Sequence, residues 1–268
     1  MSRLAELKKL VSGKKRVLVL YSGGLDSTLL AHVAGEVIGS GTVALTFDSP
    51  IVPRYEIAKA KRLAGEIGIK HVILSINELE QGSHFAENPP ERCYICRKLR
   101  NFSAREWADR HGFETVADGT NFSDYEDYRP GMKASLEDDI WQPFIELKIT
   151  KEEIKELSQG LGLPGWDKPN TVCLCSRFPY GTPLNEEMLS KVEAAEDHLR
   201  KLGFDGFRIR SFPYETAIVE LEEPEMALEY RKDIVSALKG LGFAFVTLDL
   251  EGFISGKLNR IITSKGRG

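Results

Sequence analysis

The sequence predicts an α/β protein in which a doubly wound parallel sheet is followed by a smaller C-terminal α+β domain. Three observations support this expectation. Short apolar runs alternate with amphipathic segments of helical length through the first half of the chain. A glycine-rich turn joins the apolar run at residues 17–21 to the helical segment that follows it. A stretch rich in proline and glycine, residues 164–183, separates this half from a second set of strands and helices.

The first half contains four expected strands, each joined to the next by a segment of helical length. The strands are expected at residues 17–21, 42–48, 71–75 and 115–118, and the helices at 1–10, 29–37, 55–67 and 97–111. This alternation is typical of parallel strands with helical crossovers. The carboxyl ends of such strands share one edge of the sheet, where ligands bind. We therefore expect the polar strand exits at 22–28, 46–48 and 119–121 to surround one nucleotide.

The second half is expected to form a small domain of mixed topology. Thr150 and Glu153 predict a capping box, so a helix should begin at Lys151 and stop near residues 160–162. Further helices are expected at 185–202 and 225–241, and strands at 206–210, 217–221 and 244–250. The expected domains are 1–168, a cysteine-bearing functional loop at 169–183, and a substrate and oligomerisation domain at 184–268. The last domain is too small to bury much apolar surface alone, so it is expected to pack on the first domain or on a neighbouring subunit, and a homo-oligomer is expected.

Composition narrows the class of protein. The chain has 268 residues, 42% of them hydrophobic and 28% charged, which is typical of a globular domain. The formal net charge of −4 provides no general attraction to nucleic acid, so a nucleic-acid partner is not expected. No run of eighteen apolar residues occurs and the N-terminus resembles a charged amphipathic helix, which predicts a cytoplasmic protein without a membrane partner.

The glycine-rich turn has the composition of a phosphate-binding loop. It is the segment Ser22-Gly23-Gly24-Leu25-Asp26-Ser27-Thr28. The two glycines allow backbone N–H groups to converge on an anion, and the following helix adds its positive end. The three hydroxyl groups are further donors, whereas the Asp26 carboxylate is suited to hold Mg²⁺ or to order the loop. The alternative is an ordinary turn between a strand and a capped helix.

The turn lacks the lysine of common P-loops and resembles the PP-loop of the ATP pyrophosphatase family, which has an adenine nucleotide alpha hydrolase-like fold. The resemblance implies that ATP is bound with Mg²⁺ and that a substrate oxygen attacks its α-phosphate, releasing pyrophosphate. The expected ATP-binding residues are Ser22, Gly23, Gly24, Asp26, Ser27, Thr28, Thr46, Asp48, Gly119, Thr120, Asn121 and Arg129. Asp26 is also expected to be catalytic.

The four cysteines form two pairs with different spacings. Cys93 and Cys96 form a C-x-x-C pair expected just before a helix, and Cys173 and Cys175 form a C-x-C pair. Four clustered cysteines are too few for a disulfide scaffold. Three alternatives stay open: a zinc site held by all four, a redox C-x-x-C pair, or an iron–sulfur cluster on three thiolates, with a free thiolate as another possible nucleophile.

Several motifs together resemble the LarE family of ATP-dependent sulfur transferases. They are SGGLDST at 22–28, NPPERCYIC at 88–96, ADGTN at 117–121, DYRPG at 127–131, KP at 168–169, CL at 173–174, SRFPYG at 176–181 and TLDLEG at 247–252. The resemblance implies a small-molecule nucleotide substrate, pyridinium-3,5-biscarboxylic acid mononucleotide, one carboxylate of which is adenylated and converted to a thiocarboxylate. The product leads to the nickel-pincer nucleotide cofactor.

The resemblance also implies a role for each cysteine. Cys173 matches the residue whose thiolate, in single-cysteine members, displaces AMP and then loses its own sulfur. This chain departs from that form by carrying Cys93, Cys96 and Cys175 as well. The resemblance therefore implies a [4Fe–4S] cluster with three of the four cysteines as ligands, and zinc is the alternative metal. It also implies that Cys173 and Cys175 are catalytic. It does not identify the sulfur donor.

Several charged residues are candidates for binding the substrate. Arg208 and Arg210 alternate along one strand and are expected to grip the substrate phosphate, with Glu196 orienting them or binding a metal. Arg177 is expected to be catalytic, lowering a thiolate pKa or binding the adenylate, and Arg129 to neutralise phosphate charge. Each residue also has a structural alternative. The two strand arginines could lie on a solvent-exposed face, and Glu196 on a solvated helix face. Arg177 could cap its loop, and Arg129 could form a surface ion pair.

Three other functions compete with sulfur transfer to a small nucleotide. A PP-loop tRNA-thiolating enzyme should have a basic groove, yet the chain has no tract rich in lysine and arginine. An amidating relative of NAD synthetase would leave the paired cysteines unexplained. A non-catalytic nucleotide-binding regulator would use the cysteines only for structural zinc.

Overall fold

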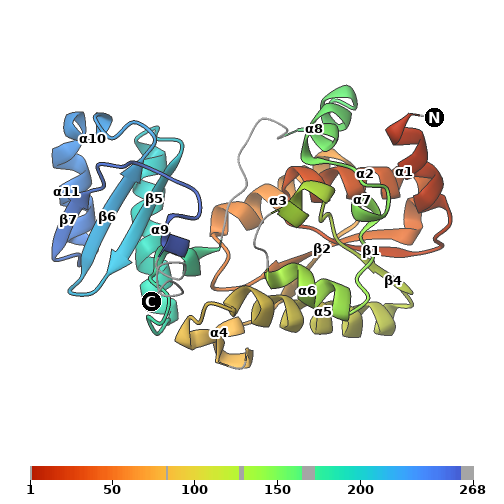
Figure 1. The fold of residues 1–268 in the computed structure, drawn as a ribbon, viewed down its shortest axis with the longest axis horizontal. Helices are drawn as coiled ribbons and strands as arrows, with labels where there is room; N and C mark the ends of the chain where they lie inside the picture. Colours follow the sequence, from red (N-terminus) through yellow and green to blue (C-terminus); the bar gives the residue numbers. More distant parts are fainter. Residues whose placement is uncertain (1, 83, 127–129, 165–172, 261–268) are drawn as a thin grey trace. The chain divides into compact units, whose positions relative to one another are not determined.

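The computed structural model describes residues 2–82, 84–126, 130–164 and 173–260 (Figure 1). The chain forms two compact units. Unit 1 comprises Met1–Ser83 and Glu91–Thr171, and unit 2 comprises His84–Pro90 and Val172–Gly268. The short segment His84–Pro90 therefore belongs with the C-terminal part of the chain although it lies within the first half of the sequence. Among the described residues, no helix combines the length and apolar character needed to cross a membrane.

Unit 1 is built on a parallel four-stranded sheet. Its strands are β1 (Val17–Leu20), β2 (Thr42–Asp48), β3 (His71–Ser75) and β4 (Thr115–Ala117). The strand order is β3-β2-β1-β4, with every neighbouring pair parallel. The strand order reverses next to β1, so the loop that leaves β1 lies at the switch point where doubly wound sheets bind ligands. The predicted α/β fold class is confirmed.

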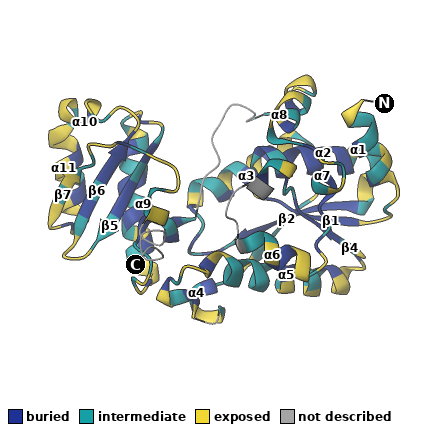
Figure 2. Cartoon of the chain, viewed as in Figure 1, coloured by how far each residue is buried: buried dark blue, intermediate teal, exposed yellow. Residues whose placement is uncertain are grey.

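Helices cover both faces of this sheet (Figure 1). One layer contains α1 (Arg3–Ser12), α2 (Leu25–Ile38), α3 (Arg54–Glu66), α7 (Pro143–Glu146) and α8 (Lys151–Gly160). The other layer contains α4 (Glu78–Gln81), α5 (Arg92–His111) and α6 (Pro130–Glu137). Successive strand residues point to opposite faces, so Val19 packs in the core beneath α2 whereas Leu18 packs in the core beneath α5. The central strands are consequently buried on both faces (Figure 2).

The predicted capping box of α8 is present. The Thr150 hydroxyl accepts from the backbone N–H of Glu153 at 3.3 Å, and the Glu153 carboxylate accepts from the backbone N–H of Thr150 at 2.9 Å. This backbone hydrogen bond lowers the pKa of Glu153, with a further contribution from Arg3. The start of α8 is therefore held at a fixed position, which matters for Lys151.

Three predicted helix boundaries were wrong. Helix α2 begins at Leu25 rather than at residue 29, so the last four residues of the predicted glycine-rich turn form the first turn of this helix. Helix α5 begins at Arg92 rather than 97, so Cys93 and Cys96 lie inside its first turns, because no proline or glycine interrupts the chain between Pro90 and Gly112. The helix expected at 225–241 is instead two helices, α10 (Met226–Glu229) and α11 (Arg231–Gly240). The break lies at Tyr230, whose backbone has φ −95° and ψ 11° and whose ring packs edge-on against Phe204.

Unit 2 contains a three-stranded sheet with two longer helices. Its elements are α9 (Glu186–Lys201), β5 (Phe207–Phe212), β6 (Thr216–Leu221), α10, α11 and β7 (Phe245–Leu248). Strands β5 and β6 form an antiparallel hairpin, and the helical crossover places β7 parallel to β6. Short 3₁₀ segments complete both units at Gly39–Gly41, Phe85–Glu87, Phe122–Glu126, Leu174–Arg177 and Lys257–Asn259.

Candidate nucleotide loop and cysteine turn

The glycine-rich loop after β1 is held by its own hydroxyl groups and by a neighbouring helix. The Ser22 hydroxyl accepts from the backbone N–H of Gly24 at 3.2 Å, and the Ser27 hydroxyl donates to the Gly24 carbonyl at 3.1 Å. Gly23 has φ +69°, and a Cβ built there would lie 2.9 Å from the Cα of Ala60 in α3. Glycine is therefore required at this position both for its conformation and for the close approach.

The exits of β1 and β2 are joined by hydrogen bonds. The Thr46 hydroxyl donates to the Tyr21 carbonyl at 2.6 Å and also contacts His71 Nε2 at 2.8 Å. Since the hydroxyl proton goes to the carbonyl, the imidazole nitrogen must be the donor of the second bond. Burial lowers the pKa of His71, with a smaller contribution from Lys61. Thr46 thus fixes the strand exits, and Thr28 lies next to the Tyr21 hydroxyl at 3.4 Å.

The loop after β4 packs directly on the glycine-rich loop. A Cβ at Gly119 would lie 2.9 Å from both the carbonyl carbon of Asp26 and the amide nitrogen of Ser27. The Asp118 carboxylate stabilises this loop by accepting from the backbone N–H of Thr120 at 2.9 Å. Of the predicted nucleotide-binding residues, the structure therefore brings the 22–28 and 119–121 segments together.

Asn121 and Asp118 are buried polar residues beside this contact. Asn121 is 2% exposed, and its Oδ1 has no hydrogen-bond partner among the residues that the structure describes. Asp118 is also 2% exposed and accepts from Ser135 at 3.1 Å and Gln142 at 3.3 Å. Sequence reasoning included Asn121 but missed Gln142, because no motif connects a residue so far along the chain to the strand exit.

The two acidic residues expected near the phosphates both have basic partners. Lys151 Nζ lies 2.6 Å and 2.8 Å from the two carboxylate oxygens of Asp26. Arg54 forms an ion pair with Asp48. Sequence reasoning missed Lys151, which follows the Thr150 cap. Arg129 lies outside the described residues.

In unit 2, the cysteine turn is the segment from Cys173 to Arg177, and a buried ion pair supports it. The fully buried Arg177 donates to both carboxylate oxygens of Glu196, at 2.9 Å and 2.8 Å. It also donates to the Cys173 carbonyl at 3.1 Å and to the Ser176 hydroxyl at 2.9 Å. The pair thereby fixes the backbone on both sides of Cys175, which is itself buried.

The two arginines of β5 share a sheet face but have different surroundings. Arg210 is 5% exposed and donates to the Ser176 carbonyl and to the Glu220 carboxylate, both at 2.7 Å. Arg208 is half-buried, donates to the Phe207 carbonyl at 2.7 Å and lies over the ring of Phe253. Arg210 therefore contacts the cysteine turn, which the alternation of arginines along the strand did not indicate.

The other cysteine pair lies in unit 1. Cys93 and Cys96 are three residues apart in α5, so they lie on one face of the helix. Cys96 Sγ is 3.6 Å from the carboxylate of Glu78, which is fully buried and paired with Arg100 at 2.7 Å. None of the four cysteines forms a disulfide in the part of the chain that the structure describes. Within the described ranges, the structure contains no group of three or more His, Cys, Asp or Glu side chains arranged to hold a metal ion.

Comparison with known proteins identifies the family. Residues 16–88 match the family model of the queuosine biosynthesis protein QueC. A Synechocystis protein, slr1717, is 42% identical over 98% of each chain. The pyridinium-3,5-bisthiocarboxylic acid mononucleotide synthase of Lactiplantibacillus plantarum is 36% identical over 98% of this chain and 95% of its own. The chain belongs to the LarE family. It is therefore an ATP-dependent, sulfur-transferring enzyme of the PP-loop superfamily.

A more distant relative has a different named activity. The tRNA-specific 2-thiouridylase of Thermoanaerobacter sp. is 23% identical over 68% of this chain and 61% of its own. The LarE similarity, by contrast, extends across both units of this chain.

The residues of unit 1 fit the ATP and Mg²⁺ that the PP-loop superfamily uses. Gly23 and Gly119 leave backbone surfaces that a side chain would fill, and the unpartnered Asn121 Oδ1 is suited to a donor such as an amino or hydroxyl group. Asp26 provides the carboxylate oxygens that Mg²⁺ prefers.

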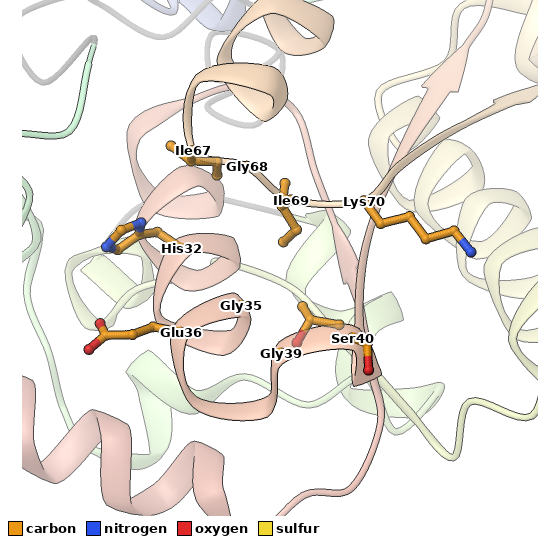
Figure 3. Close-up of a pocket in the computed structure, with 10 residues that line it drawn as sticks. His32, Gly35, Glu36, Gly39, Ser40, Ile67, Gly68, Ile69 and Lys70 are labelled. Carbon is orange, nitrogen blue, oxygen red and sulfur yellow. The ribbon is translucent and has the colours of Figure 1, made fainter.

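A separate cavity of about 510 Å³ lies elsewhere in unit 1 (Figure 3). It is lined by His32, Glu36 and Lys70, among others, and by Thr42, the first residue of β2. It therefore lies near the amino ends of the strands, whereas the glycine-rich loop lies at the carboxyl ends. The cavity does not belong to the candidate nucleotide site.

Proposed function

We propose that this protein uses ATP to adenylate a carboxylate of pyridinium-3,5-biscarboxylic acid mononucleotide and then converts that carboxylate to a thiocarboxylate. The carboxylate oxygen attacks the α-phosphorus of ATP, pyrophosphate leaves, and an acyl adenylate forms. A sulfur nucleophile then attacks the acyl carbon and AMP leaves. The observation that carries the proposal is the glycine-rich loop at the switch point of the sheet, packed against both Ala60 and Gly119.

Unit 1 supplies the chemistry of activation in this proposal. The amino end of α2 attracts the phosphates, because the first turn of a helix carries partial positive charge. Asp26 would hold Mg²⁺, and the cation would supply positive charge beside the phosphates. Further residues are proposed to contact the nucleotide through their hydroxyl, carboxylate, amide, guanidinium or backbone groups. They are Ser22, Ser27, Thr28, Thr46, Asp48, Gly119, Thr120, Asn121 and Arg129.

Sulfur delivery is proposed to depend on the cysteines. Three thiolates among Cys93, Cys96, Cys173 and Cys175 would hold a [4Fe–4S] cluster, and its open iron would carry the transferable sulfide. The cysteine side chains on one face of α5 and on the cysteine turn are suitable ligands, since thiolates hold the iron of such clusters. We favour this form because a cluster can be reloaded, whereas a cysteine that gives up its sulfur becomes dehydroalanine. In that alternative, Cys173 attacks the acyl adenylate and elimination breaks its own C–S bond. Structural zinc is the further alternative.

Unit 2 is proposed to hold the substrate phosphate and to position the cysteine turn. Arg208, half-buried on its sheet face, is the candidate for the phosphate. The hydrogen bonds of Arg177, Glu196 and Arg210 support a positioning role for these three, because each is already joined to the turn or to its supporting ion pair.

We also propose that the protein acts in the cytoplasm, because four cysteines in two close pairs are typical of a metal or redox site rather than of the disulfides of secreted proteins. A homo-oligomer is proposed as well, since the small C-terminal domain would bury little apolar surface alone. Its product would serve the assembly of the nickel-pincer nucleotide.

The activation step is tested by following pyrophosphate. Protein purified without oxygen is incubated with ATP, Mg²⁺ and pyridinium-3,5-biscarboxylic acid mononucleotide. Asp26→Asn should slow pyrophosphate release by about 100-fold or more, because the carboxylate that holds Mg²⁺ is lost. The exposed Asp109→Asn in α5 is the matched control and should release pyrophosphate at the wild-type rate. Undiminished release by Asp26→Asn would rule out this loop as the activating site.

The metal is tested on the same preparation. Iron and acid-labile sulfide in the anaerobic protein support the cluster, whereas one zinc and no iron would contradict it.

A further inference from the structure

Lys151 is bound to Asp26 in an arrangement that helix electrostatics alone would disfavour. Lys151 is the first residue of α8 and Asp26 is in the first turn of α2. The amino end of a helix carries partial positive charge, so a lysine at that end is unfavourable without a nearby anion. Asp26 provides this anion through both of its carboxylate oxygens, at 2.6 Å and 2.8 Å from Nζ.

The backbone of Lys151 is anchored to the loop that follows β4. Its N–H donates to the Ser123 hydroxyl at 3.0 Å, and the neighbouring Phe122 N–H donates to the Ile149 carbonyl at 2.9 Å. The same loop packs through Gly119 on the backbone of Asp26. Lys151 is therefore held firmly between the two loops that surround the proposed nucleotide, and only its long side chain is left to change partner.

In the absence of nucleotide, Lys151 and Asp26 balance each other's charge. Lys151 and Asp26 are both partly withdrawn from water, with side chains 35% and 17% exposed. The Asp26 carboxylate, the more buried of the two, would be costly to leave without a positive partner. The buried Asn121 Oδ1, two residues before Ser123, has no partner among the described residues and indicates that a donor-bearing ligand completes this loop.

We propose that Lys151 is a pyrophosphate-binding residue, which exchanges Asp26 for the β- and γ-phosphates when ATP and Mg²⁺ bind. This inference rests on the proposed function. Asp26 turns its oxygens from the ammonium to Mg²⁺, because this hard cation prefers carboxylate ligands. The Lys151 ammonium then lies between the amino ends of α2 and α8, where phosphate oxygens are the favourable partners. The lysine thus neutralises Asp26 before binding and pyrophosphate charge afterwards.

The first test measures binding of pyrophosphate with Mg²⁺, and separately of AMP, to the intact protein by calorimetry. Lys151→Gln should weaken pyrophosphate binding about 10- to 100-fold, the effect of losing a charge-assisted hydrogen bond. AMP binding should change less than about 2-fold, because AMP lacks the β- and γ-phosphates. Lys151→Arg should restore most of the affinity. The matched control is Lys155→Gln, which removes the same charge from an exposed position one turn further along α8.

The outcomes separate this inference from the proposed function. Wild-type protein that binds neither pyrophosphate nor AMP would contradict the nucleotide site itself. Normal wild-type binding with unchanged pyrophosphate affinity in Lys151→Gln would overturn only the role of Lys151. Equal weakening of AMP and pyrophosphate would also overturn it, since that result indicates a structural role.

A second measurement tests the exchange directly. Without Mg²⁺, Asp26→Asn should bind pyrophosphate more tightly than the wild type, because the lysine no longer has a competing carboxylate. The combined Asp26→Asn and Lys151→Gln variant should lose this gain. If the combined variant keeps the full gain, the exchange is wrong.

Discussion

The glycine-rich loop of unit 1 and the cysteine turn of unit 2 achieve fixed backbone geometry in different ways. The loop is held by close backbone packing, since Gly23 touches Ala60 and Gly119 touches Asp26. The cysteine turn is held by buried charges, since Arg177 and Arg210 donate to its carbonyls. The first arrangement leaves Asn121 Oδ1, in the loop after β4, without a hydrogen-bond partner among the described residues. In the second arrangement, the arginine donors are bonded to carbonyl and carboxylate groups of the protein itself.

This difference determines what each region tolerates. The loop should fail when a side chain is added, because there is no space for a Cβ. The turn should fail when a charge is removed, because its partner is left buried and unpaired. Adding a side chain to the loop and removing a charge from the turn should therefore have different effects.

The largest expected effect is on sulfur transfer through the cysteine turn. Cys173→Ser and Cys175→Ser should each abolish formation of the thiocarboxylate, because serine supplies no thiolate as ligand or nucleophile. Pyrophosphate release should remain near the wild-type rate, since activation is assigned to unit 1. Product analysis and a pyrophosphate assay on the same samples measure both. Loss of both activities together would mean that the turn holds a structural metal.

The next largest effect is on stability. Arg177→Met should lower the free energy of unfolding by about 3–5 kcal/mol, because the Glu196 carboxylate stays buried without its partner. Arg110→Met, which removes an exposed arginine paired with Glu106, should cost less than about 1 kcal/mol. Denaturant titration measures both. Adding Glu196→Leu to Arg177→Met should recover part of the loss, and a loss below about 1 kcal/mol for Arg177→Met would contradict the supporting role of the ion pair.

A smaller effect is expected in the glycine-rich loop. Gly119→Ala should cost about 1–3 kcal/mol, because its Cβ would press on the backbone of Asp26 and Ser27. It should also weaken ATP binding by displacing the loop. Gly65→Ala is the control, since a Cβ there meets no atom within 4 Å and Gly65 lies in α3, where alanine favours the helix by about 0.5–1 kcal/mol. Thermal unfolding and ATP calorimetry distinguish them, and equal behaviour of the two variants would refute the packing argument.

The smallest effect is a pH dependence of stability that arises from His71, the first residue of β3. Burial lowers the pKa of His71 in the folded protein, so the unfolded chain binds the proton more readily. The contribution of His71 is fully present above its unfolded pKa of about 6.5 and is lost as pH falls through its lowered folded pKa. His71→Gln should flatten this part of the stability profile while keeping a donor for Thr46. The exposed His111→Gln is the control, and an unchanged profile in His71→Gln would remove His71 as the cause.

Much of unit 1 was predictable because its signals are local in sequence. The strands Thr42–Asp48 and His71–Ser75 have the predicted boundaries, and the Thr150 capping box is present. Apolar periodicity, glycine in a strand–helix turn and a cap are each encoded within a few residues. The same reasoning placed the start of α5 too late, because Cys93 and Cys96 were interpreted as a loop motif although their spacing also fits a helix.

The partners of the charged residues were not predictable in this way. Arg177 meets Glu196 from a position 19 residues away, and Lys151 meets Asp26 across 125 residues. Only the tertiary fold brings these charges together. The sequence therefore predicted that Asp26, Arg177 and Glu196 would contact a metal ion or a ligand. It did not predict that each of them pairs with another residue of the protein.

The most direct test of the whole account is the product formed by the purified protein. Mass spectrometry follows pyridinium-3,5-biscarboxylic acid mononucleotide after incubation with ATP, Mg²⁺ and a sulfide source under anaerobic conditions. We expect a product in which one carboxylate oxygen is replaced by sulfur, formed only when ATP is present and accompanied by AMP and pyrophosphate. An unchanged mononucleotide, with ATP intact and wild-type protein carrying its metal, would contradict the proposed function.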